Sequence, residues 1–170
     1  MPRRPLVLLV ENDADDELLA LRALGNANIP HEVVVCRSGQ EAVDFLCGPG
    51  CPASLGPDRV PALVLLDLKI PGMDGFEVLK RVRCDGVARH VPIVVALSSD
   101  EPADVHRAYA LGANAYVRNT ADPAGKVARA TAVLRFWLEV NVWDRGKVHH
   151  SDRRIGPPDR RSYPETGSSG

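Results

Sequence analysis

The segment from residue 63 to residue 83 reads LVLLDLKIPGMDGFEVLKRVR and carries a strand signal, a turn signal and a helix signal in succession. Its first four residues, Leu63–Leu66, form a continuous apolar run, which is typical of a strand buried on both faces. Pro71-Gly72 favours a tight turn, because proline fixes φ and glycine can take a positive φ. Apolar residues then recur at helical spacing from Phe76 onward. The segment predicts a strand, a turn and a helix, with Asp67 at the end of the strand.

The same unit recurs on both sides of this segment. The apolar runs are Leu6–Val10, Val33–Cys36, Ala62–Leu66, Pro92–Leu97 and Ala115–Val117. Apolar residues at helical spacing lie between and after the runs, including Leu18, Leu21 and Leu24, then Phe76, Leu79 and Val82, and finally Val127, Ala130, Leu134 and Trp137. Helix-start signals are Ser38 with Glu41, Asp74 with Glu77, and Asp122-Pro123. Right-handed crossovers then predict an α/β fold, a doubly wound parallel sheet with helices on both faces.

Composition excludes several classes of protein. The chain has 170 residues, 45% of them apolar, and a net charge of −1, so we expect neither a nucleic-acid partner nor a polybasic membrane contact. No apolar run approaches the roughly 18 residues of a membrane span, and we expect a cytoplasmic protein. The four cysteines lack zinc-site and thioredoxin spacing, so we expect reduced thiols at Cys36, Cys47, Cys51 and Cys84.

Polar residues follow the apolar runs directly. Glu11-Asn12 follow the first run, Asp67 the third, Ser98 the fourth and Asn119 comes shortly after the fifth. The carboxyl ends of parallel strands meet at one edge of the sheet, where such folds bind ligands. Carboxylates gathered there favour Mg²⁺, and a central carboxylate can attack phosphorus as a nucleophile. The pattern therefore predicts phosphoryl transfer to an aspartate.

Four segments together resemble the receiver domain of two-component response regulators. They read VLLVENDADD, LVLLDLKIPGMDGFEVLKRVR, VPIVVALSSD and AYALGANAYV, and they cover roughly residues 5–140 in the family's order. The resemblance implies a flavodoxin-like sheet of five strands in the order 2-1-3-4-5. RAYALGANAY and the aromatic-rich end Leu134–Trp137 are most similar to the single-domain regulators that accompany bacterial and cyanobacterial phytochromes.

The resemblance implies a role for each residue that matches the family's motifs. It makes Asp67 the phosphoacceptor, Ser98 the switch hydroxyl and Tyr116 the aromatic switch. It assigns Mg²⁺ to Glu11, Asn12, Asp67 and the backbone carbonyl of Lys69. The implied partner is a histidine kinase, with a phytochrome-type kinase as one candidate. The protein would then be a switch that catalyses only its own phosphoryl transfer and dephosphorylation.

Two positions depart from the family pattern. Asn12 stands where the family usually has an aspartate that binds the metal directly. Asn119 stands where the family has a lysine, so a charge-assisted hydrogen bond to the phosphoryl group is replaced by a weaker neutral one. The neighbouring Asp13 and Arg118 are candidates to compensate. A pseudo-receiver that binds or dimerises without phosphorylation is therefore an alternative function.

A flavodoxin-like enzyme that binds flavin or a nucleotide is a second alternative, and it is less compatible with the sequence. It would need a glycine loop for phosphate after the first strand, where acidic residues stand instead. The segment GPGCPA at residues 48–53 matches a dinucleotide fingerprint by letter, but it follows a predicted helix rather than a strand.

The C-terminal part of the chain is rich in large apolar residues. We expect a receiver domain over residues 1–143 and a Pro/Gly/Arg-rich tail without fixed structure over residues 144–170. The last helix has more large apolar groups than one face can bury, and such a patch commonly marks a partner. We expect a homodimer whose interface includes Phe136, Trp137, Val140 and Trp143.

Overall fold

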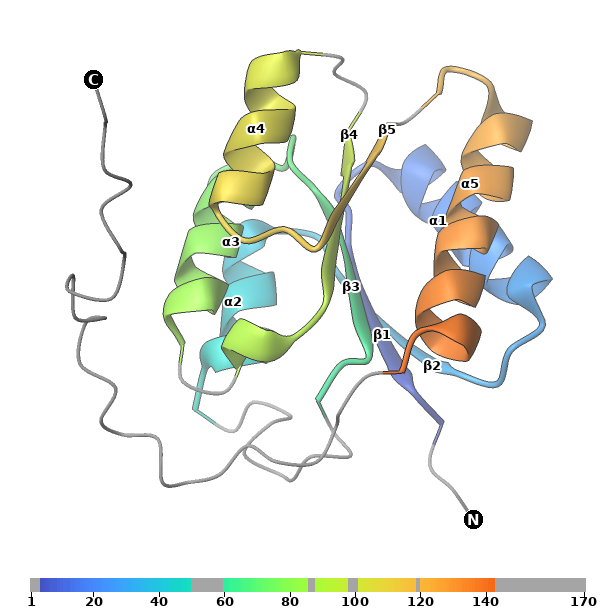
Figure 1. Cartoon of the computed structure of the whole chain (residues 1–170), viewed down its shortest axis with the longest axis horizontal. Helices are drawn as coiled ribbons and strands as arrows, with labels where there is room; N and C mark the ends of the chain where they lie inside the picture. The colour runs from blue at the N-terminus through green and yellow to red at the C-terminus, as the bar shows by residue number, and fades with distance from the viewer. Residues whose placement is uncertain (1–3, 50–59, 86–87, 98–100, 119, 143–170) are drawn as a thin grey trace, which may run out of the picture.

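The computed structural model describes residues 4–49, 60–85, 88–97, 101–118 and 120–142 (Figure 1). Its strands are β1 (Leu6–Val10), β2 (Glu32–Cys36), β3 (Leu63–Asp67), β4 (Ile93–Leu97) and β5 (Ala115–Arg118). They form one sheet in the order β2-β1-β3-β4-β5, and every neighbouring pair is parallel. The predicted α/β fold and strand order are confirmed.

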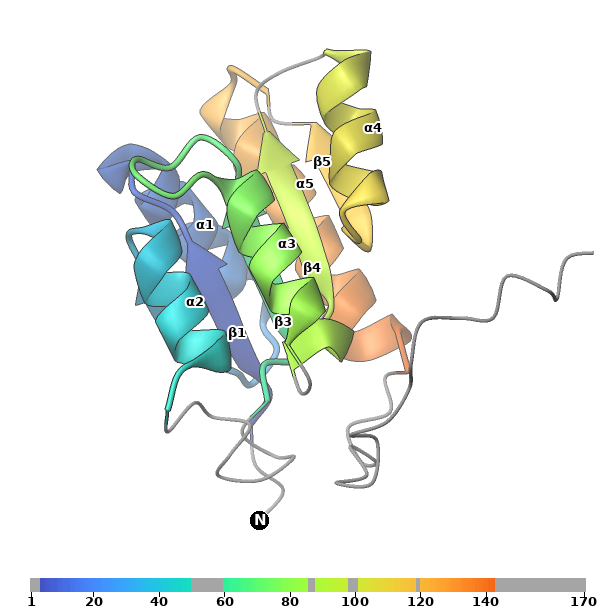
Figure 2. The ribbon, with the colours of Figure 1, turned by 90° about the vertical axis from the view of Figure 1, so that its left-hand side faces the viewer.

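Helices cover both faces of the sheet. They are α1 (Ala14–Ala27), α2 (Gly39–Cys47), α3 (Gly75–Cys84), α4 (Pro102–Ala110) and α5 (Pro123–Arg135), with a short 3-10 turn η3 (Ala88–His90) before β4. Figure 1 shows α1 and α5 on one face and α2, α3 and α4 on the other, and the turned view in Figure 2 shows the latter three in front. The sheet is thus the middle of three layers.

Alternate residues of the central strands belong to two separate hydrophobic cores, one on each face of the sheet. Leu8 and Val10 of β1 pack toward α2, α3 and α4, whereas Val7 and Leu9 pack toward α1 and α5. All four are buried, with at most 4% of their surface exposed. This double burial explains why the strands are continuously apolar in sequence.

The predicted helix starts form as capped ends. Ser38 accepts a hydrogen bond from the backbone N–H of Glu41 at 3.2 Å, and Asp74 accepts one from Glu77 at 2.9 Å. Asp122 caps α5 by accepting from the N–H of Gly125 at 2.7 Å, and Pro123 opens that helix. These caps satisfy backbone donors that the first helical turn leaves unpaired.

The predicted apolar face of α1 is wrong in part. Leu24 is buried, but Leu18 and Leu21 are 48% and 37% exposed. The helix instead buries Ala23 and Ala27, which belong to the same core cluster as residues of α5. Small residues suit this contact, since the Thr131 hydroxyl of α5 donates to the Ala23 carbonyl of α1 at 3.3 Å. Close packing of α1 on α5 therefore decides which face of α1 is buried, and the spacing of its leucines does not.

The end of α5 continues into a π-helical turn, η4 (Phe136–Val140). The C-terminal boundary predicted at residue 143 and the tail 144–170 lie outside the described residues. In the part of the chain that the structure describes, no helix is both long enough and apolar enough to span a bilayer. Cys36, Cys47 and Cys84 are reduced thiols there, and Cys51 is not described.

Candidate functional site

The register of the central strands places two carboxylates side by side. Val10 of β1 pairs with Leu66 of β3, so the residues that follow them, Glu11 and Asp67, leave the sheet at the same level. Glu11 continues this alignment on its other side, because its N–H donates to the Cys36 carbonyl at 3.0 Å. The predicted meeting of Glu11 and Asp67 at the carboxyl edge of the sheet is confirmed.

Glu11 is the buried acid of this site. It is 8% exposed, and its Oε1 accepts a hydrogen bond from the backbone N–H of Asp13 at 2.9 Å. Burial, together with the smaller effects of the negative charges of Asp67 and Asp16, raises the pKa of Glu11 to about 7, although backbone hydrogen bonds act in the opposite direction. A carboxyl group with this pKa binds a cation readily, because a cation relieves the cost of its charge.

Asp67 is half-buried at the end of β3. Burial raises its pKa above the ordinary aspartate value, while hydrogen bonds from the N–H groups of Lys69 and Leu68 act in the opposite direction. The Lys69 N–H donates to Asp67 Oδ1 at 3.1 Å. These backbone donors fix the orientation of the carboxylate at the carboxyl end of β3.

The loop after Asp67 is shaped by two glycines. Gly72 has φ of +78°, as the Pro-Gly turn predicts. Gly75 begins α3 against the end of β3, and its N–H donates to the Leu68 carbonyl at 3.1 Å. A Cβ at Gly75 would lie 2.6 Å from the Asp67 carbonyl oxygen, so this close approach requires glycine.

The other predicted site residues have different outcomes. Asn12 is exposed beside the buried Glu11. Tyr116 is half-buried on β5 and packs on the core beneath α2, α3 and α4.

Ser98 and Asn119 lie outside the described residues, so their roles stay predictions. Asp13 is the N-cap of α1 and accepts from the N–H groups of Asp15 and Asp16.

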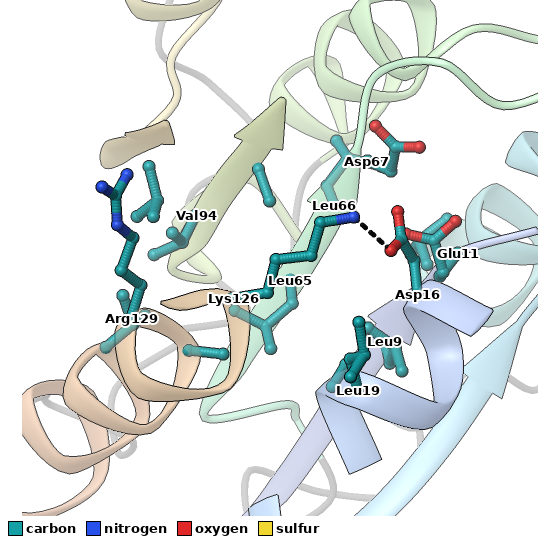
Figure 3. A pocket seen from close by; sticks show the side chains of 16 residues that line it. Leu9, Glu11, Asp16, Leu19, Leu65, Leu66, Asp67, Val94, Lys126 and Arg129 are labelled. Atoms are coloured by element: carbon teal, nitrogen blue, oxygen red, sulfur yellow. Dashed lines mark hydrogen bonds and ion pairs between the residues drawn. The ribbon is translucent and has the colours of Figure 1, made fainter. Parts of the chain in front are cut away.

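A lysine that the sequence reasoning missed enters the site from α5. A cavity of about 80 Å³ lies between α1, α5 and the sheet, and Glu11, Asp16, Asp67 and Lys126 all line it. Figure 3 shows the Lys126 side chain crossing this cavity toward α1, where its Nζ forms an ion pair with Asp16 Oδ1 at 2.5 Å. Lys126 and Asp16 are far apart in sequence, so spacing gave no signal for this pair.

The carboxylates fit a divalent cation. Mg²⁺ in proteins is usually held by one or two carboxylates, with water and phosphate oxygens completing its shell. Glu11 and Asp67 provide two such oxygen groups, and burial raises the pKa of both carboxyl groups. Among the described residues, no three acidic, histidine or cysteine side chains come close enough to cage a metal by themselves. The arrangement suits Mg²⁺ shared with a phosphoryl group.

The predicted interface residues divide between core and surface. Trp137 packs against the core on the α1 and α5 side and makes an edge-to-face contact with Phe136, with ring centroids 5.4 Å apart. Phe136 is 50% exposed and Val140 is 67% exposed. Trp143 lies outside the described residues.

The geometry defines a parallel α/β sheet with an acidic cavity at its carboxyl edge, and the comparisons with known proteins show the class of protein to which this arrangement belongs. Residues 7–129 match the model of the response regulator receiver domain, so the chain belongs to this family of two-component signalling proteins. This assignment favours a signalling domain over the flavodoxin-like enzyme considered above. The strand order 2-1-3-4-5 that the family resemblance implies is the order in the structure.

Within this family, the chain is similar to several phytochrome-associated response regulators. The chain is 31% identical over 134 residues to response regulator Rcp1 of Synechocystis sp., covering 79% of this chain and 89% of Rcp1. It is similar to the solved Mn(2+)-bound form of Rcp1 (TM-score 0.71, 29% identity, 82% and 99% of the two chains). The phosphorylated cyanobacterial phytochrome response regulator RcpA gives a TM-score of 0.75 at 34% identity, covering 82% of this chain and 98% of RcpA. The bacteriophytochrome response regulator AtBRR gives 0.60 at 40% identity, covering 78% and 95%.

Proposed function

We propose that this protein is a single-domain response regulator that accepts a phosphoryl group on Asp67 from a histidine kinase. The observation that carries the proposal is the alignment of Asp67 with the buried Glu11 at the carboxyl edge of the sheet. The extent of the match to Rcp1 and the phosphorylated structure of RcpA support it. The phytochrome relatives make a phytochrome-type kinase in the cytoplasm the first partner to test.

The transfer is a displacement at phosphorus. A carboxylate oxygen of Asp67 forms the new P–O bond, and the P–N bond of the kinase phosphohistidine breaks with its electron pair staying on the imidazole nitrogen, which takes a proton. Glu11, Asn12, Asp67 and the Lys69 carbonyl would hold Mg²⁺. The bound cation offsets the negative charge of the carboxylates and phosphoryl oxygens, and the Mn(2+)-bound form of Rcp1 supports a divalent cation here.

The switch residues would convert phosphorylation into a change of the protein surface. The phosphoryl group adds charge and strong hydrogen-bond acceptors, toward which the Ser98 hydroxyl would move while Tyr116 turns inward. This rearrangement would reshape the surface formed by α4, β5 and α5. Other proteins would recognise the changed surface by direct contact. A second copy of this chain is one such partner.

The homodimer would use the apolar groups at the end of the chain. The exposed rings and methyl groups of Phe136 and Val140 support it, with Trp143 as a further predicted contact. Trp137 would support the interface from behind, because it packs on the core of its own domain. Sedimentation at several concentrations tests this proposal, and a monomer mass that does not change with concentration would refute it.

The experiment for the proposed function is phosphorylation by acetyl phosphate with Mg²⁺, followed by intact-mass spectrometry. We expect one added phosphoryl group on the native protein and none on Asp67→Asn. Sensitivity of the adduct to hydroxylamine would identify it as an acyl phosphate. A native protein that binds Mg²⁺ but never gains the group would instead support the pseudo-receiver alternative raised by Asn12 and Asn119.

A further inference from the structure

The cavity under Asp67 has walls of opposite charge. Glu11 directly after β1, Asp16 of α1 and Asp67 of β3 present three carboxyl groups, and α5 faces them with Lys126 and Arg129. These two cations behave differently. Figure 3 shows Lys126 pointing at the carboxylates, whereas the guanidinium of Arg129 lies on the side away from them, where it donates to the Arg118 carbonyl at 2.6 Å.

Lys126 is held in place by its surroundings. Its side chain is 22% exposed and that of its partner Asp16 is 29% exposed, so the pair is partly removed from water. Its backbone N–H donates to Asp122 in the capped first turn of α5, which fixes where the stem leaves the helix. An ammonium group so positioned is stronger electrostatically than one on an exposed surface, because water screens it less.

A phosphoryl group on Asp67 would increase the demand for positive charge. It would carry close to two negative charges in place of the single charge of the Asp67 carboxylate, in a site that already holds Glu11 and Asp16. Position 119, where the family resemblance led us to expect a lysine, is Asn119. An amide can donate a hydrogen bond but cannot neutralise charge. Lys126 is the cation that the described structure directs into this cavity.

We propose that Lys126 of α5 is the basic residue that neutralises the phosphoryl group on Asp67, and that it leaves Asp16 to do so. This inference rests on the proposed function at Asp67. The exchange of partners moves one ammonium group from a carboxylate to a phosphoryl oxygen, without bond making or proton transfer. It also breaks the ion pair that joins α1 to α5, so occupation of the site changes the contact between the first and last helices.

The test is binding of beryllofluoride, formed from Be²⁺ and excess fluoride, to the full chain in the presence of Mg²⁺. The dissociation constant is measured by titration of the thermal unfolding midpoint, since a ligand of the folded state raises it. Lys126→Met keeps the length of the stem and removes the charge, and we expect it to weaken binding at least about ten-fold. Arg129→Met removes a charge from the same cavity wall and should change binding less than about two-fold.

Asp16→Asn separates the partner-exchange model from a structural ion pair. If Lys126 must leave Asp16, releasing it in Asp16→Asn tightens beryllofluoride binding, and this gain disappears when Lys126→Met is added. A structural ion pair would make both single variants bind more weakly. Asn119→Lys in the Lys126→Met background should restore binding, because it supplies the lysine that the family has at this position of the sequence.

The outcomes distinguish the two proposals. If the native protein binds beryllofluoride and Lys126→Met binds it equally well, the role of Lys126 is wrong while the function of Asp67 stands. If the native protein binds none although it binds Mg²⁺, both proposals fall. If Lys126→Met and Arg129→Met weaken binding equally, the effect is general electrostatics and the specific contact is refuted.

Discussion

The Tyr109 hydroxyl of α4 accepts a hydrogen bond from the backbone N–H of Tyr116 in β5 at 3.2 Å. β5 is one of the two edge strands of the sheet, and edge strands carry backbone groups that no neighbouring strand can pair. Tyr109 thus supplies a partner for the backbone of the very residue proposed as the aromatic switch. Any displacement of Tyr116 that shifts its backbone must stretch this contact with α4.

Tyr109→Phe tests this tie between α4 and β5. Removing the hydroxyl leaves the Tyr116 N–H without its acceptor, which should cost about 0.5–1.5 kcal/mol of unfolding free energy. The Tyr116 amide should also exchange with solvent several-fold faster in hydrogen-exchange measurements. Unchanged exchange at this amide would show that the bond does not hold α4 on β5.

Arg83 should be a strong determinant of stability. Its guanidinium donates to the carbonyls of Arg89, Val91 and Gly112 and to Asn114 Oδ1, all at 2.8–2.9 Å. Burial lowers its pKa, yet the four acceptors hold the charge where α3, β4 and the turn before β5 meet. Arg83→Met removes this donor from all four acceptors, of which Asn114 Oδ1 keeps only the N–H of Ile93, and should lower the unfolding free energy by roughly 2–4 kcal/mol in urea titrations.

Arg81→Met is the matched control for Arg83. Arg81 lies on the same helix and pairs with Glu77 at 2.9 Å on the exposed surface. An exposed pair of this spacing contributes about 0.3–0.5 kcal/mol, so the urea midpoint should hardly move. Equal losses in the two variants would contradict the importance assigned to the buried network.

Glu11 should make the metal-free protein less stable as pH rises. Its pKa is about 7 in the folded chain against 4.5 for an ordinary glutamate, so folding favours the neutral form. The stabilisation is complete below pH 4.5 and is lost as pH rises through 7. At about 1.4 kcal/mol per pKa unit, the loss between pH 5 and pH 8 is on the order of 2–3 kcal/mol.

Glu11→Gln measures this contribution, because it keeps the shape of the side chain and cannot ionise. Urea unfolding with a chelator present should show a smaller loss of stability between pH 5 and pH 8 for Glu11→Gln than for the native protein. Saturating Mg²⁺ should reduce the loss in the native protein. Parallel pH profiles for the two proteins would argue that Glu11 has an ordinary pKa.

Gly75→Ala should damage the site through the backbone. The new Cβ would lie 2.6 Å from the Asp67 carbonyl oxygen and 2.7 Å from the Leu68 Cα, neither of which can move without shifting the end of β3. Overpacking of this kind costs about 1–3 kcal/mol, and phosphorylation by acetyl phosphate should slow as well. Gly25→Ala in α1 meets nothing within 4 Å and should instead raise stability by about 0.5–1 kcal/mol.

The sheet could be predicted from the sequence because its signals are local. Leu63–Leu66 is buried on both faces, and its continuous apolar run reports that directly. The turn at Gly72 and the cap at Asp74 are likewise local choices of residue. The carboxylate at Asp67 followed from its place at a strand end, without knowledge of its neighbours.

The parts that sequence reasoning missed depend on how helices rotate and approach each other. Leu18 has helical spacing, but the orientation of α1 is set by the small residue Ala23 against α5. Lys126 is an ordinary helix residue until α5 packs beside α1 and brings it to Asp16. Trp137 could not be assigned to the core rather than to the interface without knowing where α5 ends.

The position of α5 has a consequence for how the chain is synthesised. Leu65 and Val94 face a core that Leu134 of α5 completes, and Lys126 closes the cavity under Asp67 from the same helix. The ribosome makes α5 after all five strands, so a nascent receiver carries an uncovered apolar face until nearly the whole domain has emerged. Asp67, the proposed phosphoryl acceptor, is synthesised early, yet its pocket is completed last, so a chain that ends before α5 would lack one wall of that pocket and part of the core.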